Sequence, residues 1–280
     1  LPKFNSMAVT MADITHLRKM TGAGMMDCKN ALTEAENDFD KAVEIIRKKG
    51  QAVAAKRSDR DASEGCVLAK SAGDYAVMIA LKCETDFVAK NADFVALTTQ
   101  ILDLAIANKC ADVEAVKALP MGNGTVADAI VDRSGITGEK MELDGYGIVS
   151  GATTSVYIHP GNKLATIVAF NQAGFDAQVA HEVAMQIAAM NPISVDADSV
   201  PAEVLQREKD IAADKAREEG KPENMIERIA AGRIGKFYKE VCLLEQEFVK
   251  DPKLTIAQFL DGASKGLTVT EFKRFTLNAD

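Results

Sequence analysis

The sequence predicts an α+β fold with a helical module at its start, a duplicated core of antiparallel sheets with flanking helices, and an inserted helical hairpin. Three observations carry this prediction. Apolar residues recur at helical spacing near the start, and a strand–turn–strand–helix pattern occurs twice, about ninety residues apart. Towards the end, two charged, Ala-rich helical stretches meet at a turn that contains Gly and Pro.

Residues 11–50 are expected to form three short helices that make a compact module. Apolar residues recur at helical spacing in each helix, and Gly22-Ala23-Gly24 separates the first helix from the second. Asp38 can cap the third helix, and Gly50 is expected to end it. The following residues, 51–63, are small, charged and poorly patterned, so we expect a linker there.

The central part of the chain is expected to contain two related halves. In the first half, a turn over 71–74 leads into a strand, Tyr75–Cys83, whose apolar residues alternate on one face before a helix follows. In the second half, strands over 155–158 and 164–170 precede a helix over 175–190. The predicted divisions of the core are 64–135 for the first half, 136–198 for the first part of the second half, and 242–280 for its last part and the tail.

Residues 199–241 are expected to form the helical hairpin. Gly220 can end the first helix, and Pro222 can begin the second. An arm this narrow cannot bury both sides of its apolar seam, so two arrangements are open, a homodimer through the hairpin or a lone arm. The residues available for the seam are Val204, Ile211, Met225, Ile226, Ile229 and Ile234.

Composition bears on partners and compartment. The net charge of −8 favours a protein partner over direct nucleic-acid binding. The five cysteines are widely spaced and include no CxxC pair, which predicts a reducing, cytoplasmic location without disulfides or a zinc site. No apolar stretch approaches the ~20 residues that a membrane-spanning helix needs, so we expect no membrane association.

The sequence offers no pattern for bond-breaking chemistry. The phosphate-binding pattern GxxxxGK[ST] is absent, and Met185 replaces the second His that a zinc-protease pattern beginning at His181 would need. Cys83 could act as a nucleophile with His159 as its base, but its position on an inward strand face favours a small apolar filler. We therefore expect a binding protein, not an enzyme, with no cofactor and no metal.

Two apolar pairs stand at expected helix starts. Met25-Met26 follows a Gly turn, where flexible thioethers suit an adaptable contact surface, and core packing of one of the two is equally open. Phe87 also leaves two interpretations. A helix that begins before it would bury Phe87 and Phe94 on one face, because they are seven residues apart. A helix that begins at 91–93 would instead leave Asp86 and Phe87 outward on a turn.

Two segments carry a family resemblance. Residues 17–42 read LRKMTGAGMMDCKNALTEAENDFDKA, and residues 83–94 read CETDFVAKNADF. Both resemble signatures of the bacterial translation elongation factor Ts family, and the order of parts is similar over residues 11–280. The two signatures together are highly specific.

The resemblance implies a guanine-nucleotide exchange factor for the GTPase elongation factor Tu. Such a factor promotes the release of GDP from the GTPase and breaks no covalent bond. It also implies a fold like the ubiquitin-associated domain (UBA-like) for the helical module and a coiled-coil arm for the hairpin. Asp86 and Phe87, between Thr85 and Val88, match the residues that enter a groove of the GTPase near its magnesium site. The other positions that match partner contacts are Leu17, Arg18, Met25, Met26, Lys29, Arg57, His159, Val249 and Lys250. The alternative function is a UBA-like adaptor that only scaffolds.

The resemblance also separates the two copies of Asp-Phe-Val-Ala. Asp93 and Phe94 match a structural copy that caps the helix and fills the core, whereas Asp86 and Phe87 match an outward, functional copy. One segment departs from the family. Where members show Ile-Gly-Glu-Asn and an Arg pair, this chain reads Ser134-Gly-Ile-Thr-Gly-Glu-Lys-Met141, so no contact is assigned there.

Overall fold

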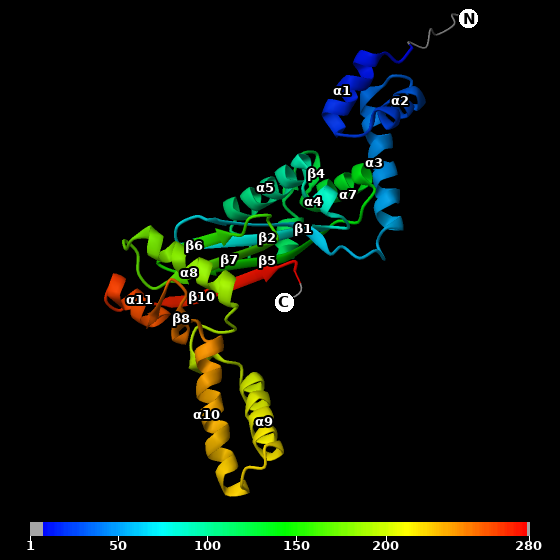
Figure 1. Cartoon of the computed structure of the whole chain (residues 1–280). Coiled ribbons are helices and arrows are strands. Elements are labelled where there is room, and N and C mark those ends of the chain that lie inside the picture. Colours follow the sequence, from blue (N-terminus) through cyan, green and yellow to red (C-terminus); the bar gives the residue numbers. More distant parts are fainter. Residues whose placement is uncertain (1–7, 279–280) are drawn as a thin grey trace, which may run out of the picture. The chain divides into compact units, whose positions relative to one another are not determined.

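The computed structural model describes residues 8–278 and shows a mixed α+β architecture of helices and antiparallel strand pairs (Figure 1). The chain divides into two compact units. The first unit comprises the residues up to 66 together with 79–146, and the second comprises 67–78 together with the residues from 147 onward. Within residues 8–278, none of the helices combines the length and the apolarity that a membrane crossing requires.

The first unit begins with the three predicted helices, α1 (Met11–Thr21), α2 (Met25–Glu34) and α3 (Phe39–Lys56). Thr10 caps α1 by accepting a hydrogen bond from the backbone N–H of Asp13, and Gly22, at φ 73°, ends it in the left-handed region that glycine adopts most readily. The helices enclose a small core whose buried members are Ile14, Leu17, Ala23, Cys28, Ala31, Leu32, Ala35 and Ala42.

Helix α3 continues past Gly50 to Lys56, so the expectation that Gly50 ends it is wrong. Gly50 is buried inside α3, where the helix crosses α7 (Val126–Thr137). A Cβ atom added at Gly135 of α7 would lie only 2.1 Å from the Cα atom of Gly50. The missing side chain of Gly135 therefore lets the two helix backbones approach each other at Gly50, and local sequence patterns do not distinguish a glycine at such a crossing from a helix stop.

A three-stranded sheet has the order β1 (Glu64–Ser71), β2 (Tyr75–Cys83) and β5 (Glu142–Ser150). In β2 the residues from Ala76 to Leu81 are all buried, so both faces of this strand are covered and not only the alternating face. The first unit also contains α4 (Asp86–Ala89), α5 (Ala92–Ala107), α6 (Val113–Lys117), β3 (Pro120–Met121) and β4 (Gly124–Thr125).

The second unit contains a sheet with the order β10 (Val269–Thr276), β7 (Leu164–Phe170) and β6 (Thr153–Ile158), in which both strand pairs are antiparallel. Helix α8 (Ala177–Met190) packs on β6 and β7 (Figure 1). The second predicted strand–turn–strand–helix pattern is thus confirmed. Shorter elements complete the unit: η1 (Ala197–Ser199), η2 (Leu243–Glu245), β8 (Glu247–Phe248), β9 (Asp251–Thr255) and α11 (Ile256–Ala263).

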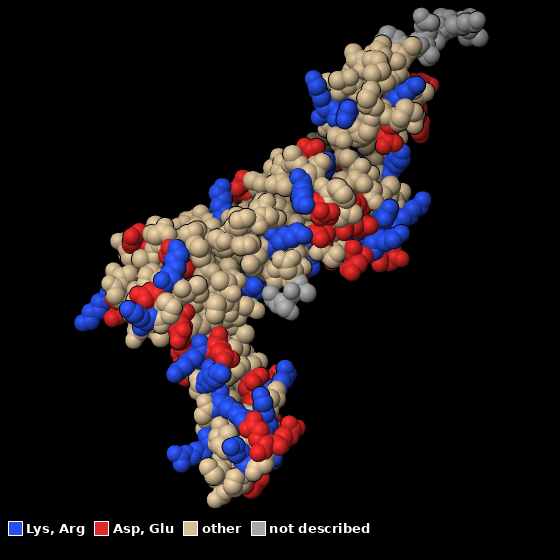
Figure 2. Space-filling model, in the orientation of Figure 1, with Lys and Arg blue, Asp and Glu red and all other residues tan. Residues whose placement is uncertain are grey.

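Two long helices, α9 (Ala202–Glu218) and α10 (Glu223–Val241), pack against each other in the second unit. Gly220, at φ 76°, lies in the turn between them, as the sequence predicts. Basic and acidic side chains mix over their surface (Figure 2). Ile211 and Met225 were expected in the seam but are 51% and 44% exposed, because Ala212 and Ala216 fill buried positions together with the expected Ile226.

Candidate partner-binding site

Phe87 lies on α4, a single helical turn between β2 and α5. Its side chain is 83% exposed, whereas Phe94 of α5 is fully buried. The side chain of Asn91 accepts hydrogen bonds from the backbone N–H groups of Asp93 and Phe94, so α5 starts anew after α4. The outward interpretation of Phe87 is therefore confirmed, with two corrections. The outward copy is itself helical, and the cap of α5 is Asn91 and not Asp93, which stands in the first turn.

Asp86 is the first residue of α4. Its carboxylate receives the Lys90 ammonium at 3.0 Å, one helical turn further along, and keeps 44% of its side chain exposed. Thr85 precedes it as the cap, and its Oγ1 accepts a hydrogen bond from the backbone N–H of Val88 at 3.4 Å. The turn thus presents an acidic and an aromatic side chain next to each other at the end of a buried strand.

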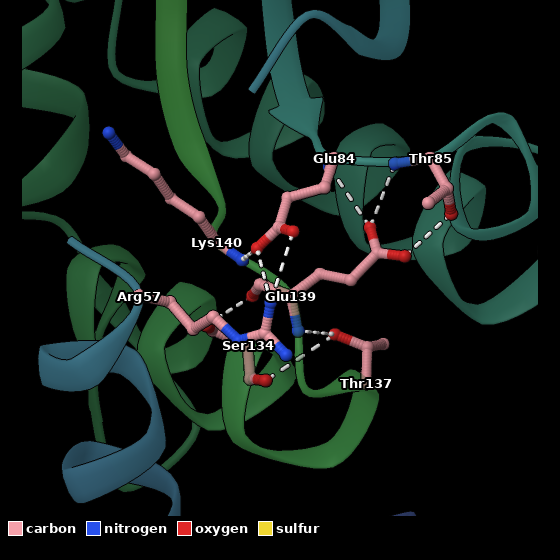
Figure 3. Close-up of polar contacts among 7 residues, drawn as sticks. All are labelled: Arg57, Glu84, Thr85, Ser134, Thr137, Glu139 and Lys140. Atoms are coloured by element: carbon pink, nitrogen blue, oxygen red, sulfur yellow. Dashed lines mark hydrogen bonds and ion pairs between the residues drawn. The ribbon is translucent and has the colours of Figure 1, made fainter. Parts of the chain in front are cut away.

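Two pairs of neighbouring residues hold this turn through exchanged hydrogen bonds, shown in Figure 3. We call Glu84, Thr85, Glu139 and Lys140 the carboxylate clamp. Glu139 accepts from the backbone N–H groups of Glu84 and Thr85, both at 3.0 Å, and from the Thr85 hydroxyl at 2.5 Å. In the other direction, Glu84 accepts from the backbone N–H of Lys140 at 2.7 Å. Each pair therefore gives a carboxylate to the backbone of the other.

Arg57 joins the clamp from the end of α3 (Figure 3). Its guanidinium donates to both carboxylate oxygens of Glu84, at 3.2 and 3.5 Å. The side chain of Glu84 is only 16% exposed, while that of Arg57 is 37% exposed. Because the pair is partly screened from water, it supports Glu84 more than an exposed ion pair would. The structure thus ties Arg57 to the base of the α4 turn.

Sequence reasoning did not identify Glu139 as part of the site. Gly138, at φ 72°, ends α7 in the left-handed region and directs the chain back towards β5. The hydroxyl of Ser134 then donates to the carbonyl of Glu139 at 2.5 Å, which fixes its backbone. The available signal is the Gly138-Glu139 pair, which is similar to the Gly-Glu of the Ile-Gly-Glu-Asn segment named with the family resemblance.

The helical module presents its own set of predicted contact residues. Met25 and Met26, at the start of α2, are 44% and 65% exposed, so neither is packed in the core. Arg18 on α1 and Lys29 on α2 are also exposed. Leu17, in contrast, is fully buried, and its contribution is to the packing beneath this surface.

In the second unit, His159, Val249 and Lys250 lie near α8. The hydroxyl of Tyr157 is 2.9 Å from Nδ1 of His159, and the Tyr157 ring packs edge-on against His181 of α8 at 5.8 Å. The Lys250 ammonium donates to Glu182 of α8 at 2.5 Å. Val249 is 54% exposed, and its backbone N–H donates to the side chain of Gln186 at 3.0 Å. His181 and Glu182 were not predicted, yet they connect residues that lie ninety positions apart in the chain.

The chemistry of the cysteines does not fit a nucleophile. Burial, followed by the nearby Glu139 and Glu64 carboxylates, raises the pKa of the Cys83 thiol to about 12. A thiol with such a pKa carries almost no thiolate at neutral pH. All five cysteines are buried, and none is joined in a disulfide. Over residues 8–278, no group of three or more His, Cys, Asp or Glu side chains is arranged to hold a metal ion.

Comparisons with known proteins agree with the signature segments. A family model described as "Elongation factor TS" matches residues 84–279. A protein of Porphyromonas gingivalis named elongation factor Ts is 62% identical over 275 residues, which cover 98% of this chain and 100% of that protein. Another from Bacteroides thetaiotaomicron, with the same name, is 57% identical over 331 residues, covering 98% of this chain and 100% of the relative.

Proposed function

The chain belongs to the elongation factor Ts family, and from this premise we propose that it is a guanine-nucleotide exchange factor for elongation factor Tu. The observation that carries the proposal is the exposure of Phe87 beside Asp86 on an anchored turn. Of the large hydrophobic side chains described as exposed in residues 8–278, Phe87 has the highest exposed fraction. An aromatic side chain held in water on an ordered turn is available for burial in a partner.

The energetic requirement explains why such a residue is useful. A GTPase that holds GDP at nanomolar affinity binds it with about 12 kcal/mol, so spontaneous release is slow. An exchange factor accelerates release when it binds the empty GTPase better than the nucleotide-bound one. By linkage, bound nucleotide then lowers the affinity of the GTPase for the factor by the same ratio. Burying one aromatic side chain in a pocket contributes about 2–4 kcal/mol, which is available to separate elements of the nucleotide site.

In this proposal, Phe87 acts as a wedge between two helices of the GTPase, and Asp86 acts on its magnesium site. A carboxylate there competes for the donors and waters that surround the cation, whose charge dominates such a site. Thr85 and Val88 hold the wedge in place from either side. The chain itself needs no cofactor, no metal ion and no bond-breaking step for this task.

We propose that the other predicted residues add affinity for the GTPase and help to orient the chain on it. Helices α1–α3 would form a UBA-like module that rests on the GTPase through Met25, Met26, Arg18 and Lys29, with Leu17 supporting them from the core. Arg57 would act from the end of this module. His159 would add a further contact from the second half of the core, and Val249 and Lys250 would touch another domain of the partner.

A stopped-flow trace of mantGDP release from elongation factor Tu tests the exchange function. We expect the wild-type chain to accelerate release, and Phe87→Ala to lose most of the acceleration while keeping its fold. Met190→Ala is the matched control, because it shortens an exposed apolar side chain outside the proposed contacts. A scaffolding adaptor would form a complex without changing the release rate, and an unchanged rate for Phe87→Ala would remove the wedge role.

We further propose that α9 and α10 form a coiled-coil arm that pairs two copies of the chain. Ile211 and Met225 stay exposed on the arm, and two copies could bury them against each other. Sedimentation velocity at micromolar concentration should then give a dimer, and Ile211→Glu should give a monomer. A monomeric wild-type chain would leave the arm unpaired. We propose a cytoplasmic site of action without direct nucleic-acid contact, in keeping with five cysteines that form no disulfide.

A further inference from the structure

We propose that Glu139 is a positioning residue for nucleotide exchange, because its carboxylate holds the α4 turn in the conformation that presents Phe87. This inference rests on the proposed function of Asp86 and Phe87. Glu139 acts through the backbone of Glu84 and Thr85 and not by touching the partner. Its role is therefore to keep the wedge in one orientation before the partner arrives.

The α4 turn needs such support because it is too short to be stable alone. A helix of four residues makes too few internal hydrogen bonds to offset the entropy of ordering its backbone. The two N–H groups that lead into it, from Glu84 and Thr85, point at one oxygen of Glu139, each at 3.0 Å. One carboxylate thus satisfies both donors at the entrance of the turn.

The hydroxyl of Thr85 connects Glu139 to the turn itself. It donates to the second oxygen of Glu139 at 2.5 Å and accepts from the backbone N–H of Val88 at 3.4 Å. The proton of this hydroxyl is directed towards Glu139, so its lone pairs are directed towards the turn. Glu139 thereby orients the cap of the turn that carries Phe87.

Glu139 is itself held firmly enough to serve as an anchor. Its carbonyl accepts from the hydroxyl of Ser134 at 2.5 Å, and its N–H donates to the hydroxyl of Thr137 at 3.4 Å (Figure 3). The next residue, Lys140, donates its N–H to Glu84 at 2.7 Å. The clamp is therefore closed in both directions, and loss of Glu139 would leave only the Glu84 half.

Three variants test this role. Glu139→Ala removes every bond to Thr85, whereas Glu139→Gln keeps an oxygen for the two N–H groups and offers an N–H to the Thr85 hydroxyl. Glu142→Ala is the matched control, since it removes the same charge from an exposed position three residues along. Circular dichroism and thermal melting check that each variant folds.

Hydrogen exchange measures how often the α4 turn opens, and it does so without the partner. We expect the amides of Glu84, Thr85 and Val88 to exchange at least about tenfold faster in Glu139→Ala. The reason is that losing hydrogen bonds to a charged group commonly raises the rate of local opening by about this factor. Glu139→Gln and Glu142→Ala should keep most of the protection. Unchanged protection in Glu139→Ala would overturn the proposal, even if the chain proved to have no exchange activity.

The release of mantGDP from elongation factor Tu gives the functional test, as a double-mutant cycle with Phe87→Ala. We expect Glu139→Ala to reduce the acceleration by about tenfold and to cause little further loss when Phe87 is already Ala. Glu139→Gln should recover most of the activity. Additive losses, or a Gln variant as weak as Ala, would overturn the positioning role. A wild-type chain that fails to accelerate release would instead reject the exchange function and leave the hydrogen-exchange result to decide.

Discussion

Gly50 of α3 and Gly135 of α7 face each other where the two helices cross, and the position of Gly135 leaves no room for a side chain. A Cβ atom at Gly135 would meet the Gly50 backbone at 2.1 Å, whereas one at Gly50 would lie 3.4 Å from the Cα of Gly135. Arg47 of α3 extends the crossing with ion pairs to Asp128 at 3.5 Å and Asp132 at 3.8 Å. Helix α3 is thus joined to α7 by a close backbone contact with charges beside it.

Gly135→Ala should therefore destabilise the chain by about 1–3 kcal/mol, because the added methyl group forces two backbones apart. Urea unfolding followed by circular dichroism measures the change. Gly235→Ala is the control, since this glycine lies inside α10 with nothing within 4 Å of the added Cβ. In that open position Ala should stabilise the helix by up to about 1 kcal/mol. Equal effects at both positions would contradict the close crossing.

Phe94→Ala and Phe87→Ala should differ in their effect on stability, because one phenylalanine is buried and the other is exposed. Phe94 is fully buried, so its truncation should cost about 3–5 kcal/mol. Phe87 is 83% exposed, so its truncation should change stability by less than about 0.5 kcal/mol. Thermal and urea unfolding of the two variants gives the comparison. A large loss of stability in Phe87→Ala would mean that the outward turn packs more than the structure shows.

Cys83 should resist alkylation in the folded chain. With a pKa of about 12, its thiolate fraction at pH 8 is on the order of 10⁻⁴, and its side chain is fully buried. We expect intact-mass spectrometry to find no iodoacetamide adduct on native protein at pH 8, and up to five adducts after unfolding in urea. Rapid native labelling at Cys83 would instead support the nucleophile that the pKa argues against.

The ion pair between Glu182 and Lys250 should make stability depend on pH. Burial alone would raise the pKa of Glu182, but hydrogen bonds from Lys250 and Gln178 outweigh it, so the pKa lies below its ordinary value of 4.5. A carboxyl whose folded pKa is lowered contributes stability above pH 4.5, and this contribution is lost as the pH falls through the folded pKa.

Glu182→Gln should therefore lower the melting temperature at neutral pH and show a weaker decline on acidification. Melting curves from about pH 6 to about pH 3.5 measure this difference. Glu227→Gln, on the exposed surface of α10, controls for the loss of one negative charge. A decline in Glu182→Gln as steep as in the wild-type chain would show that the Lys250 contact contributes nothing to the pH dependence.

Helical periodicity could locate α5 but could not orient Phe87. Residues seven apart fall on the same helical face, so Phe87 and Phe94 are equivalent in any single-helix pattern. The difference arises at Asn91, whose side chain caps a new helix, α5, after α4 has ended at Ala89. The family resemblance, and not the pattern, indicated which copy faces outward.

The contacts that the sequence did not reveal are those between distant residues. Gly50 reads locally as a helix stop, and only the presence of Gly135, eighty-five positions later, makes it a crossing point. Glu139 reads as one acidic residue after a turn, yet it bonds to Glu84 and Thr85 more than fifty positions earlier. Local propensity determines helix and strand positions, whereas such pairs depend on how the elements meet in space.

The hydrogen bonds of the carboxylate clamp also join the two ends of the segment between Thr85 and Glu139, so that this segment forms a closed ring. The far side of this ring includes the turn between β3 and β4, where Gly122 and Asn123 are exposed. Extra residues inserted at that turn would lengthen the ring without shifting its hydrogen-bonded ends at Thr85 and Glu139. An insertion at this turn should therefore leave Phe87 in its place.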